Sequence, residues 1–217
     1  MKLEKMDEFF DKRADTYDHH MLVDLQLDEF YEEVTKYLDC SSDMFSLLDL
    51  GCGTGLELER LFKKYPNIKV TGIDLSQEML NVLKQKYAGE KLNLICGSYF
   101  DINFSKDCFD YALSTYSLHH FDESTKISLY KKIYNALKPH GIYIEGDYTC
   151  KTINEQLLYI AENEKLRMEQ EITNGFYHYD TPFTVETQMK LLKSAGFSDV
   201  KVVKEWDSTS IIVANKL

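Results

Sequence analysis

The chain has 217 residues, of which 44% are hydrophobic, and its formal net charge is −11. This hydrophobic content excludes a disordered protein, and the length is sufficient for one sizeable core. The negative charge repels phosphate backbones, so we expect no nucleic-acid partner, whereas a cationic ligand is compatible with it. The longest apolar runs are much shorter than the roughly 20 residues that a membrane span needs.

The cysteines and the N-terminal segment favour a cytoplasmic location. Five cysteines lie scattered at positions 40, 52, 96, 108 and 150, without a C-x-x-C pair. An odd number of unclustered cysteines indicates reduced thiols rather than a disulfide framework or a zinc site. The N-terminal stretch "MKLEKMDEFFDKRADTYDHH" is charged and lacks the apolar region of a secretory signal.

Short apolar runs alternate with segments of helical periodicity along the chain. The expected strands are Ser46–Leu50, Lys69–Ile73, Leu92–Cys96, Phe109–Ser114, Ile142–Gly146, Val200–Val203 and Thr209–Ala214. The expected helices cover residues 3–18, 24–38, 56–64, 76–87, 123–137 and 185–194. This alternation predicts an α/β fold in which a mostly parallel sheet has helices on both faces.

The segment from Thr152 to Pro182 interrupts this alternation. Its first two-thirds have helical periodicity, and its end is rich in aromatic residues, namely Phe176, Tyr177 and Tyr179. One interpretation is a helix and a loop that pack on the sheet edge. The other is a lid over a ligand, because ligands bind beyond the carboxyl ends of parallel strands.

The stretch "DLGCGTG" concentrates glycine where the first expected strand passes into a helix. Gly51, Gly53 and Gly55 disfavour any regular element there, and Asp49 precedes them. Such a loop exposes backbone N–H groups to a flat or anionic ligand. The spacing G-x-G-x-G lacks the third glycine of the G-x-G-x-x-G dinucleotide motif, because Leu56 takes its place.

Asp74 ends the second expected strand, 19 residues after Gly55. At this distance from a glycine loop, a carboxylate can accept hydrogen bonds from the hydroxyl groups of an adenosine ribose. Alone, Asp74 would be interpreted as a turn residue before a helix that Ser76 caps. The glycine loop at the expected distance favours ribose binding.

"LLDLGCGTG" followed by "GIDLSQEML" resembles the class I S-adenosylmethionine-dependent methyltransferases. "FDKRADTYD", "LSTYSLHHF", "ALKPHGIYI" and "LLKSAGFSDV" are similar to patterns of the small-molecule group, which includes enzymes of quinone and biotin pathways. The resemblance implies a Rossmann-like seven-stranded sheet of order 3-2-1-4-5-7-6, with the last strand antiparallel. It implies one domain over residues 1–217, with a helical cover (1–40) and a helical insertion or lid (152–182).

The same resemblance implies S-adenosylmethionine as cofactor, S-adenosylhomocysteine as product and a small-molecule methyl acceptor, which no motif specifies. The glycine loop and its flank would line the methionine and ribose side of the cofactor, through Asp49, Gly51, Cys52, Gly53, Thr54 and Gly55. Asp74 would bind the ribose, and Thr115 would lie under the methionine part. Tyr17 would either close over the carboxylate end of the cofactor or serve as a packing residue.

Adenine recognition departs from the pattern of the family. The resemblance implies that Leu75 and Met79 flank the adenine. Relatives often have an acidic residue just after the third strand, where this chain has Ser98. The adenine amino group would therefore be bound by Ser98, by Asp101 or by the backbone of Tyr99.

Methyl transfer from a sulfonium needs a base only when the acceptor must lose a proton early. The candidates for a base follow the fourth and fifth strands and are His119, His120, Asp147 and Tyr148. The histidine pair recurs in family members with differing acceptors, which favours a structural role for it. Tyr116 and the aromatic end of the 152–182 segment could form a wall near the sulfonium. No residues have the spacing of metal ligands, so we expect no metal.

Two alternatives to a methyltransferase remain at this point. A nicotinamide-dependent oxidoreductase has a related fold, although the glycine spacing argues against it. A protein that binds S-adenosylmethionine, or a modified form of it, without catalysis would explain the lack of an evident base. A protein or RNA acceptor is a weaker option within the methyltransferases, and the sequence indicates no oligomeric state.

Overall fold

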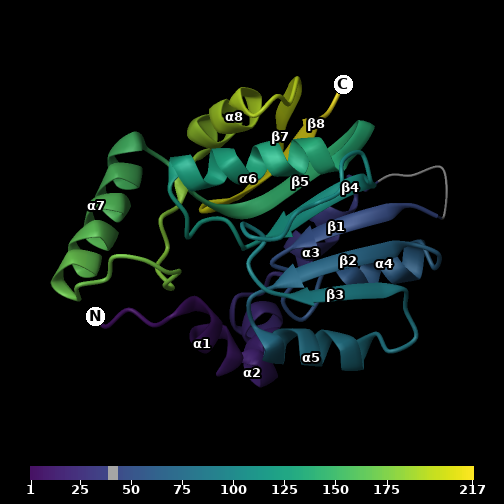
Figure 1. Cartoon of the computed structure of the whole chain (residues 1–217), viewed down its shortest axis with the longest axis horizontal. Coiled ribbons are helices and arrows are strands. Elements are labelled where there is room, and N and C mark those ends of the chain that lie inside the picture. Colours follow the sequence, from purple (N-terminus) through teal and green to yellow (C-terminus); the bar gives the residue numbers. More distant parts are fainter. Residues whose placement is uncertain (39–43) are drawn as a thin grey trace.

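The computed structural model describes residues 1–38 and 44–217, and its centre is one mixed β-sheet (Figure 1). The strands in spatial order are β3 (Leu92–Cys96), β2 (Lys69–Asp74), β1 (Ser46–Leu50), β4 (Phe109–Thr115), β5 (Leu137–Cys150), β8 (Thr209–Asn215) and β7 (Asp199–Glu205). β8 is antiparallel to β5 and β7, and the pairs among β1 to β5 are parallel. The predicted strand order and the antiparallel last strand are confirmed.

The sheet has one strand more than the seven that were expected. The short strand β6 (Phe183–Thr184) pairs in parallel with Thr149 and Cys150 at the end of β5. Two residues are too few for a period-two pattern, so the sequence does not reveal this strand. β5 is also longer than expected, because its pairing with β4 begins at Leu137 and extends around a register shift.

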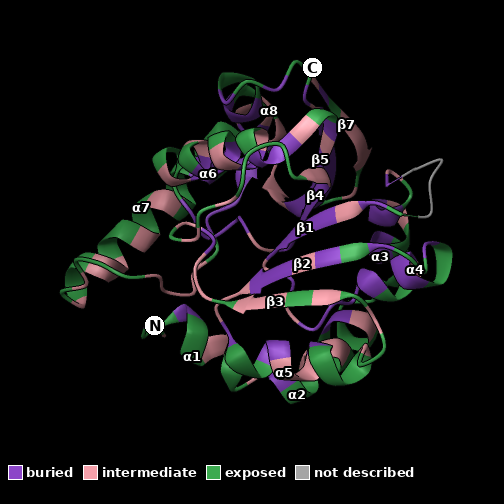
Figure 2. Ribbon diagram, turned by 45° about the vertical axis from the view of Figure 1, so that its right-hand side comes forward, coloured by how far each residue is buried: buried purple, intermediate pink, exposed green. Residues whose placement is uncertain are grey.

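The side chains of β1 alternate between two hydrophobic clusters, one on each face of the sheet. Leu48 belongs to the cluster beneath α6 (Glu123–Ala136) and α8 (Val185–Ser194). Leu47 belongs to the cluster formed with α3 (Asp28–Thr35), α4 (Leu58–Lys64) and α5 (Gln77–Lys86). Both faces are therefore covered, as predicted, and Figure 2 shows that the inner strands are more buried than the edge strand β3.

The N-terminal cover differs from the two long helices that were expected. It consists of α1 (Met6–Asp11), α2 (Ala14–His19), the π-helical turn η1 (His20–Asp24) and α3. Met6 packs into the cluster on one face of the sheet and Met21 into the cluster on the other face, which one straight helix would not allow. Gln26 has a φ of +55° and separates η1 from α3. Position 40, with its cysteine, lies outside the described residues.

The expected helix in the 152–182 segment is α7 (Ile153–Glu169), which Thr152 and Glu155 cap reciprocally. The chain then returns to the N-terminus, which lies near the end of α7 (Figure 1). The Met6 N–H donates to the Phe176 carbonyl oxygen at 3.0 Å, and the His178 N–H donates to the Glu4 carbonyl oxygen at 3.0 Å. The N-terminal cover and the 170–181 loop are thus joined to each other.

Among the residues that the structure describes, no helix combines the length and the apolar character that crossing a bilayer would require.

Candidate functional site

The loop between β1 and α4 has a backbone that suits glycine. Gly51, Gly53 and Gly55 have φ values of +71°, +47° and +72°. A Cβ atom on Gly51 would lie 2.1 Å from Oγ of Ser117, a residue that follows β4. The Gly51 N–H donates to the carbonyl oxygen of Ile73 in β2 at 2.8 Å. The loop is therefore held against the carboxyl ends of β2 and β4.

Asp74 connects the end of β2 to this loop. One carboxylate oxygen accepts the Gly53 N–H at 2.8 Å, and the other accepts the Ser76 N–H at 2.8 Å. Burial raises the pKa of Asp74 to about 6, although the two backbone donors oppose this effect. Each oxygen keeps a further lone pair, so the carboxylate can accept hydrogen bonds from a ligand as well.

A cavity of about 470 Å³, counting the part open to solvent, lies beside Asp74, and we call it the loop-side cavity. Its lining residues are Met6, Phe10, Tyr17, Gly51, Gly53, Asp74, Leu75, Met79, Tyr99, Tyr116, Ser117 and His120. Among them are seven residues that the sequence assigned to the cofactor, namely Tyr17, Gly51, Gly53, Asp74, Leu75, Met79 and Tyr99. The glycine loop, the end of β2 and α2 therefore meet around one space.

Other residues assigned to the cofactor do not line this cavity, namely Asp49, Cys52, Thr54, Gly55, Ser98 and Thr115. Cys52 is part of the hydrophobic cluster beneath the loop. The Thr54 hydroxyl donates to Asp18 of α2 at 2.5 Å, so it fastens the cover to the loop. The Ser98 Oγ accepts the Phe100 N–H at 3.2 Å within a local turn. These side chains shape the wall from behind rather than face the cavity.

Asp49 and Glu57 form a buried pair of carboxyl groups under the glycine loop. Both Asp49 oxygens and one Glu57 oxygen lack a hydrogen-bond partner within the described part of the chain. Burial and the neighbouring Glu57 raise the pKa of Asp49, and burial raises the pKa of Glu57. The Thr115 hydroxyl donates to the other Glu57 oxygen at 3.4 Å. Glu57 was not among the predicted site residues, and its sequence signal is a carboxylate between Leu56 and Leu58.

A second cavity adjoins the first, and we call it the helix-side cavity because α1, α2 and η1 form one wall. Its volume is about 1100 Å³, counting the part open to solvent. Residues from the ends of β4 and β5 and from the 170–181 loop form the opposite wall. Phe10, Tyr17, Tyr116 and His120 line both cavities. Two ligands in these cavities would thus lie next to each other.

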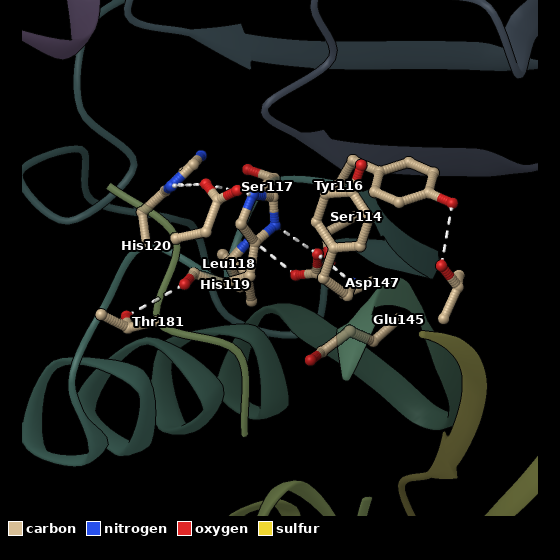
Figure 3. Close-up of polar contacts among 12 residues, drawn as sticks. Ser114, Tyr116, Ser117, Leu118, His119, His120, Glu145, Asp147 and Thr181 are labelled. Atoms are coloured by element: carbon tan, nitrogen blue, oxygen red, sulfur yellow. Dashed lines mark hydrogen bonds and ion pairs between the residues drawn. The ribbon is translucent and has the colours of Figure 1, made fainter. Parts of the chain in front are cut away.

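His119 and Asp147 meet in the wall of the helix-side cavity (Figure 3). The His119 Nδ1 lies 2.5 Å from Asp147 Oδ1, which also accepts the Tyr148 N–H at 2.8 Å. The other oxygen of Asp147, Oδ2, accepts the Leu118 N–H at 2.8 Å. Burial lowers the pKa of His119, but the carboxylates of Asp147 and Asp180 outweigh it and raise this pKa to about 9. His119 is therefore an imidazolium at neutral pH.

A carboxylate of the 170–181 loop faces three imidazole rings. One oxygen of Asp180 lies 3.4 Å from His119 Nε2, 3.3 Å from His120 Nδ1 and 3.9 Å from His178 Nε2. Burial and the charge of His119 lower the pKa of His120. Burial and the charge of His120 lower the pKa of His178 to about 4. Neither His178 nor Asp180 was among the predicted site residues, because both lie about 60 residues along the chain from His119.

His119, His120 and Asp180 bring three potential metal-ligand atoms within 4.8 Å of one another. However, His120 Nδ1 lies 3.2 Å from the Tyr179 carbonyl oxygen, which can only accept a hydrogen bond. This nitrogen therefore carries a hydrogen and offers no lone pair to a cation. The cluster is better described as a carboxylate held by N–H donors than as a metal centre.

Of the four aromatic residues proposed as a wall, Tyr116 has the central position. Its ring packs against those of Phe30 and Tyr148, with centroids 4.6 and 4.8 Å away. Its φ of +47° is unfavourable for a residue with a Cβ, and such strain gathers at functional sites. Phe176 instead packs on Phe100, while Tyr177 and Tyr179 do not line either cavity. Burial raises the pKa of Tyr148, so this predicted base keeps its proton at neutral pH.

Comparison with known proteins gives consistent similarities. Residues 47–141 match the family model described as a methyltransferase domain. A carboxy-S-adenosyl-L-methionine synthase of Nautilia profundicola is 27% identical, in a match that spans 99% of this chain and 96% of the relative. A malonyl-[acyl-carrier protein] O-methyltransferase of Priestia megaterium is 29% identical over 67% of this chain and 52% of the relative.

The fold is also that of solved structures of such proteins. Human N-acetylserotonin methyltransferase in complex with S-adenosylmethionine has a TM-score of 0.61 and 22% identity to this chain. The superposition covers 85% of this chain and 51% of the human protein. At this identity the likeness concerns the arrangement of strands and helices alone. That arrangement places the glycine loop and Asp74 at the carboxyl edge of the sheet.

Proposed function

We propose that this chain, a class I S-adenosylmethionine-dependent methyltransferase, transfers the methyl group to a small molecule bound in the helix-side cavity. The continuity of the two cavities supports this proposal. The loop-side cavity contains the glycine loop and Asp74, and it shares Tyr116 and His120 with the helix-side cavity. An acceptor in the second cavity would thus lie beside the cofactor in the first.

The residues present fit the cofactor at both of its ends. The half-buried Asp74 carboxylate in the cavity wall suits the ribose hydroxyl groups, and Leu75, Met79 and Tyr99 supply apolar surface for the adenine. The unpartnered carboxyl groups of Asp49 and Glu57 lie under the glycine loop, behind the cavity wall, and their negative charge suits the ammonium group of the methionine part on the other side of that loop. When bound, the cofactor supplies an electrophilic methyl group whose leaving group is a neutral thioether.

The protein's own contribution is positioning and exclusion of water, which together can account for most of such a rate enhancement. The described part of the cover, residues 1–38, is fastened over the loop-side cavity at two points. Asp11 accepts the Ser76 hydroxyl at 2.6 Å, and Asp18 accepts the Thr54 hydroxyl. The 152–182 segment contributes the second part of the lid. We propose that both belong to a single domain over residues 1–217.

A general base is not evident among the predicted candidates. His119 is held between Asp147 and Asp180 as an imidazolium, so at neutral pH it has no free lone pair for a proton. Asp147 is buried and already accepts hydrogen bonds from His119, Leu118 and Tyr148. We propose that the pair orients groups and stabilises negative charge in the helix-side cavity.

The similarity to a carboxy-S-adenosyl-L-methionine synthase over nearly the whole chain supports a second candidate function. A protein of this kind would modify the cofactor itself instead of passing on its methyl group. A protein that only binds the cofactor remains a further alternative. All three would bind the cofactor in the loop-side cavity, and they differ in their products.

We also propose a cytoplasmic location and no nucleic-acid partner. The four described cysteines Cys52, Cys96, Cys108 and Cys150 are free, which supports a reducing compartment. The net charge of −11 argues against phosphate backbones as partners.

Two measurements test the proposed function. Calorimetric titration with S-adenosylhomocysteine, with NADH in parallel, should show binding of the first ligand alone, and NADH binding would refute the cofactor assignment. Incubation with S-adenosylmethionine carrying a deuterated methyl group and a panel of small acceptors should then give a labelled acceptor in the mass spectrum. In a second incubation that includes small carboxylic acids as carboxyl donors, a carboxylated cofactor would identify the synthase, and binding without any product in either incubation would identify a cofactor-binding protein.

A further inference from the structure

The histidines of this chain are concentrated in one place. The sequence contains six of them, and all except His140 line the helix-side cavity. Arg13 lines it too, with its guanidinium stacked 3.5 Å from the centroid of the Phe9 ring. In a chain with a net charge of −11, this cavity therefore gathers imidazole N–H groups and the positive charges of Arg13 and His119. The charge of the whole chain favours a cationic ligand, whereas this cavity suits an anion.

The acidic residues of this cavity are already paired with its histidines. Asp24 lies 3.2 Å from His20 Nδ1, on the outer side of the cavity. Asp180 turns one oxygen toward His119, His120 and His178 at 3.3 to 3.9 Å. Its side chain is nevertheless 47% exposed, and it belongs to the loop between α7 and β6. A protein carboxylate on a surface loop thus occupies a place built from N–H donors.

We propose that the methyl acceptor carries a carboxylate group that binds against His119, His120 and His178, in the place that the Asp180 carboxylate occupies here. This inference rests on the proposed function and names its substrate class. Replacement of one carboxylate by another keeps the imidazole groups of His119 and His120 paired, so the exchange leaves neither of these buried donors unsatisfied. The two histidines adjacent in sequence are buried, which favours charge-assisted hydrogen bonds over solvation.

The fixed orientation of His119 supports this assignment. Asp147 binds its Nδ1 and is itself held by the backbone N–H groups of Leu118 and Tyr148, so Nε2 points into the cavity as a donor. The burial of His119 is compensated by the Asp147 carboxylate, and the pKa of His119 lies at about 9. The imidazolium therefore keeps one positive charge facing the cavity at neutral pH.

A carboxylate acceptor also explains why no base is needed. In the simplest reaction, a carboxylate oxygen forms a bond to the methyl carbon while the carbon–sulfur bond breaks. The electron pair of that bond stays on sulfur, which gives S-adenosylhomocysteine and a methyl ester. The ionised carboxylate has no proton to lose, so a cavity whose buried histidine is already protonated suits it.

The test uses the full chain saturated with S-adenosylhomocysteine, and phenylacetate as the probe because aromatic residues line the cavity. Its neutral twin, phenylacetamide, has the same shape without the charge. Asp180→Asn removes the internal competitor, and His119→Gln removes the charged donor. Asp207→Asn is the matched control, because Asp207 has an 89% exposed side chain and is not part of the cavity. Both Asp→Asn variants change the net charge equally.

We expect calorimetry to show that phenylacetate binds and phenylacetamide does not. Asp180→Asn should bind phenylacetate about threefold more tightly and His119→Gln about tenfold more weakly, whereas Asp207→Asn should equal the wild type. Equal binding of the two probes, or no change in Asp180→Asn, would overturn the proposal.

Because Asp180 does not line the loop-side cavity, Asp180→Asn should bind S-adenosylhomocysteine normally. If the wild-type protein itself does not bind S-adenosylhomocysteine, the proposed function is refuted instead. If His119→Gln does not fold, the Asp180→Asn result decides alone.

Discussion

Asp49 and Glu57 lie next to each other beneath the glycine loop, almost completely buried, and both Asp49 oxygens and one Glu57 oxygen lack a hydrogen-bond partner among the residues that the structure describes. Asp49 is the second-last residue of β1, and Glu57 directly precedes α4. Two carboxylates in this position repel each other unless they hold a proton or a cationic ligand. The pair therefore links the protonation of the ligand-free protein to the binding of an ammonium group.

Glu57→Gln should stabilise the ligand-free protein, because the new amide can donate to Asp49 and one buried charge is removed. The expected gain in the free energy of unfolding is about 1–2 kcal/mol. In a chain of this size it corresponds to a rise of roughly 2–8 °C in melting temperature. The raised pKa values of Asp49 and Glu57 destabilise the wild type as pH rises above the usual carboxyl range. The difference in stability between Glu57→Gln and the wild type should therefore grow with pH. The matched control is Glu59→Gln, whose side chain is 55% exposed and pairs with Lys63. Thermal unfolding of the three proteins decides, and identical melting temperatures would contradict the prediction.

S-adenosylhomocysteine affinity should depend on the ionisation of Asp74. Its pKa of about 6 means that the carboxylate is present above this pH and is lost as pH falls below it. The affinity should therefore be constant near neutral pH and fall at acidic pH, by up to about tenfold per unit for one protonation. Asp74→Asn should weaken binding by about 1–3 kcal/mol and lose this pH dependence. Calorimetry at several pH values measures both effects, with Asp207→Asn as the control. An unchanged affinity in folded Asp74→Asn would remove Asp74 from the binding site.

His119 should titrate well above an ordinary histidine. Its pKa of about 9 is raised against the effect of burial by Asp147 and Asp180. The stabilisation that this charged pair provides should be complete below about pH 6.5 and be lost as pH rises through the folded pKa. In Asp147→Asn the effect of burial should dominate and lower the pKa of His119 below its ordinary value. Asp180→Asn should cause a smaller decrease, because Asp180 is partly exposed. NMR titration of the imidazole carbons measures these values, and a wild-type His119 that titrates near 6.5 would be incompatible with the pairing.

Gly51→Ala should disrupt the glycine loop. The new Cβ atom would lie 2.1 Å from Ser117 Oγ, and the φ of +71° is unfavourable for alanine. The φ strain alone should cost about 1–2 kcal/mol of stability. The double variant Gly51→Ala, Ser117→Gly removes the collision and leaves only this strain, so it should recover part of the stability. Gly89→Ala is the control, because no atom lies within 4 Å of its added Cβ. In both denaturant unfolding and cofactor titration, Gly51→Ala should be affected most, the double variant less, and Gly89→Ala least. A Gly51→Ala variant as stable as the wild type would contradict the close packing of the glycine loop against Ser117.

The features that follow from local sequence could be predicted, and those created by distant packing could not. Two of these features are sequence patterns, namely the glycine spacing and the distance from the glycines to Asp74. The strand order follows from the family resemblance, and the observed loop and sheet agree with all three predictions. The association of His119 with Asp180 joins segments 61 residues apart, and no local pattern encodes it. The break between α1 and α2 likewise arises because Met6 and Met21 pack on opposite faces of the sheet.

The pairing of the N-terminus with the 176–178 segment has a kinetic consequence. The cover contacts the glycine loop through Asp18 and the 170–181 loop through Met6, so the roof of both cavities is one connected body. A ligand in the helix-side cavity would lie against Tyr116 and His120, which also line the loop-side cavity, and would cover that side of a ligand bound there. We therefore expect ordered turnover, in which the cofactor enters first and its product leaves last, at a rate set by the opening of this roof.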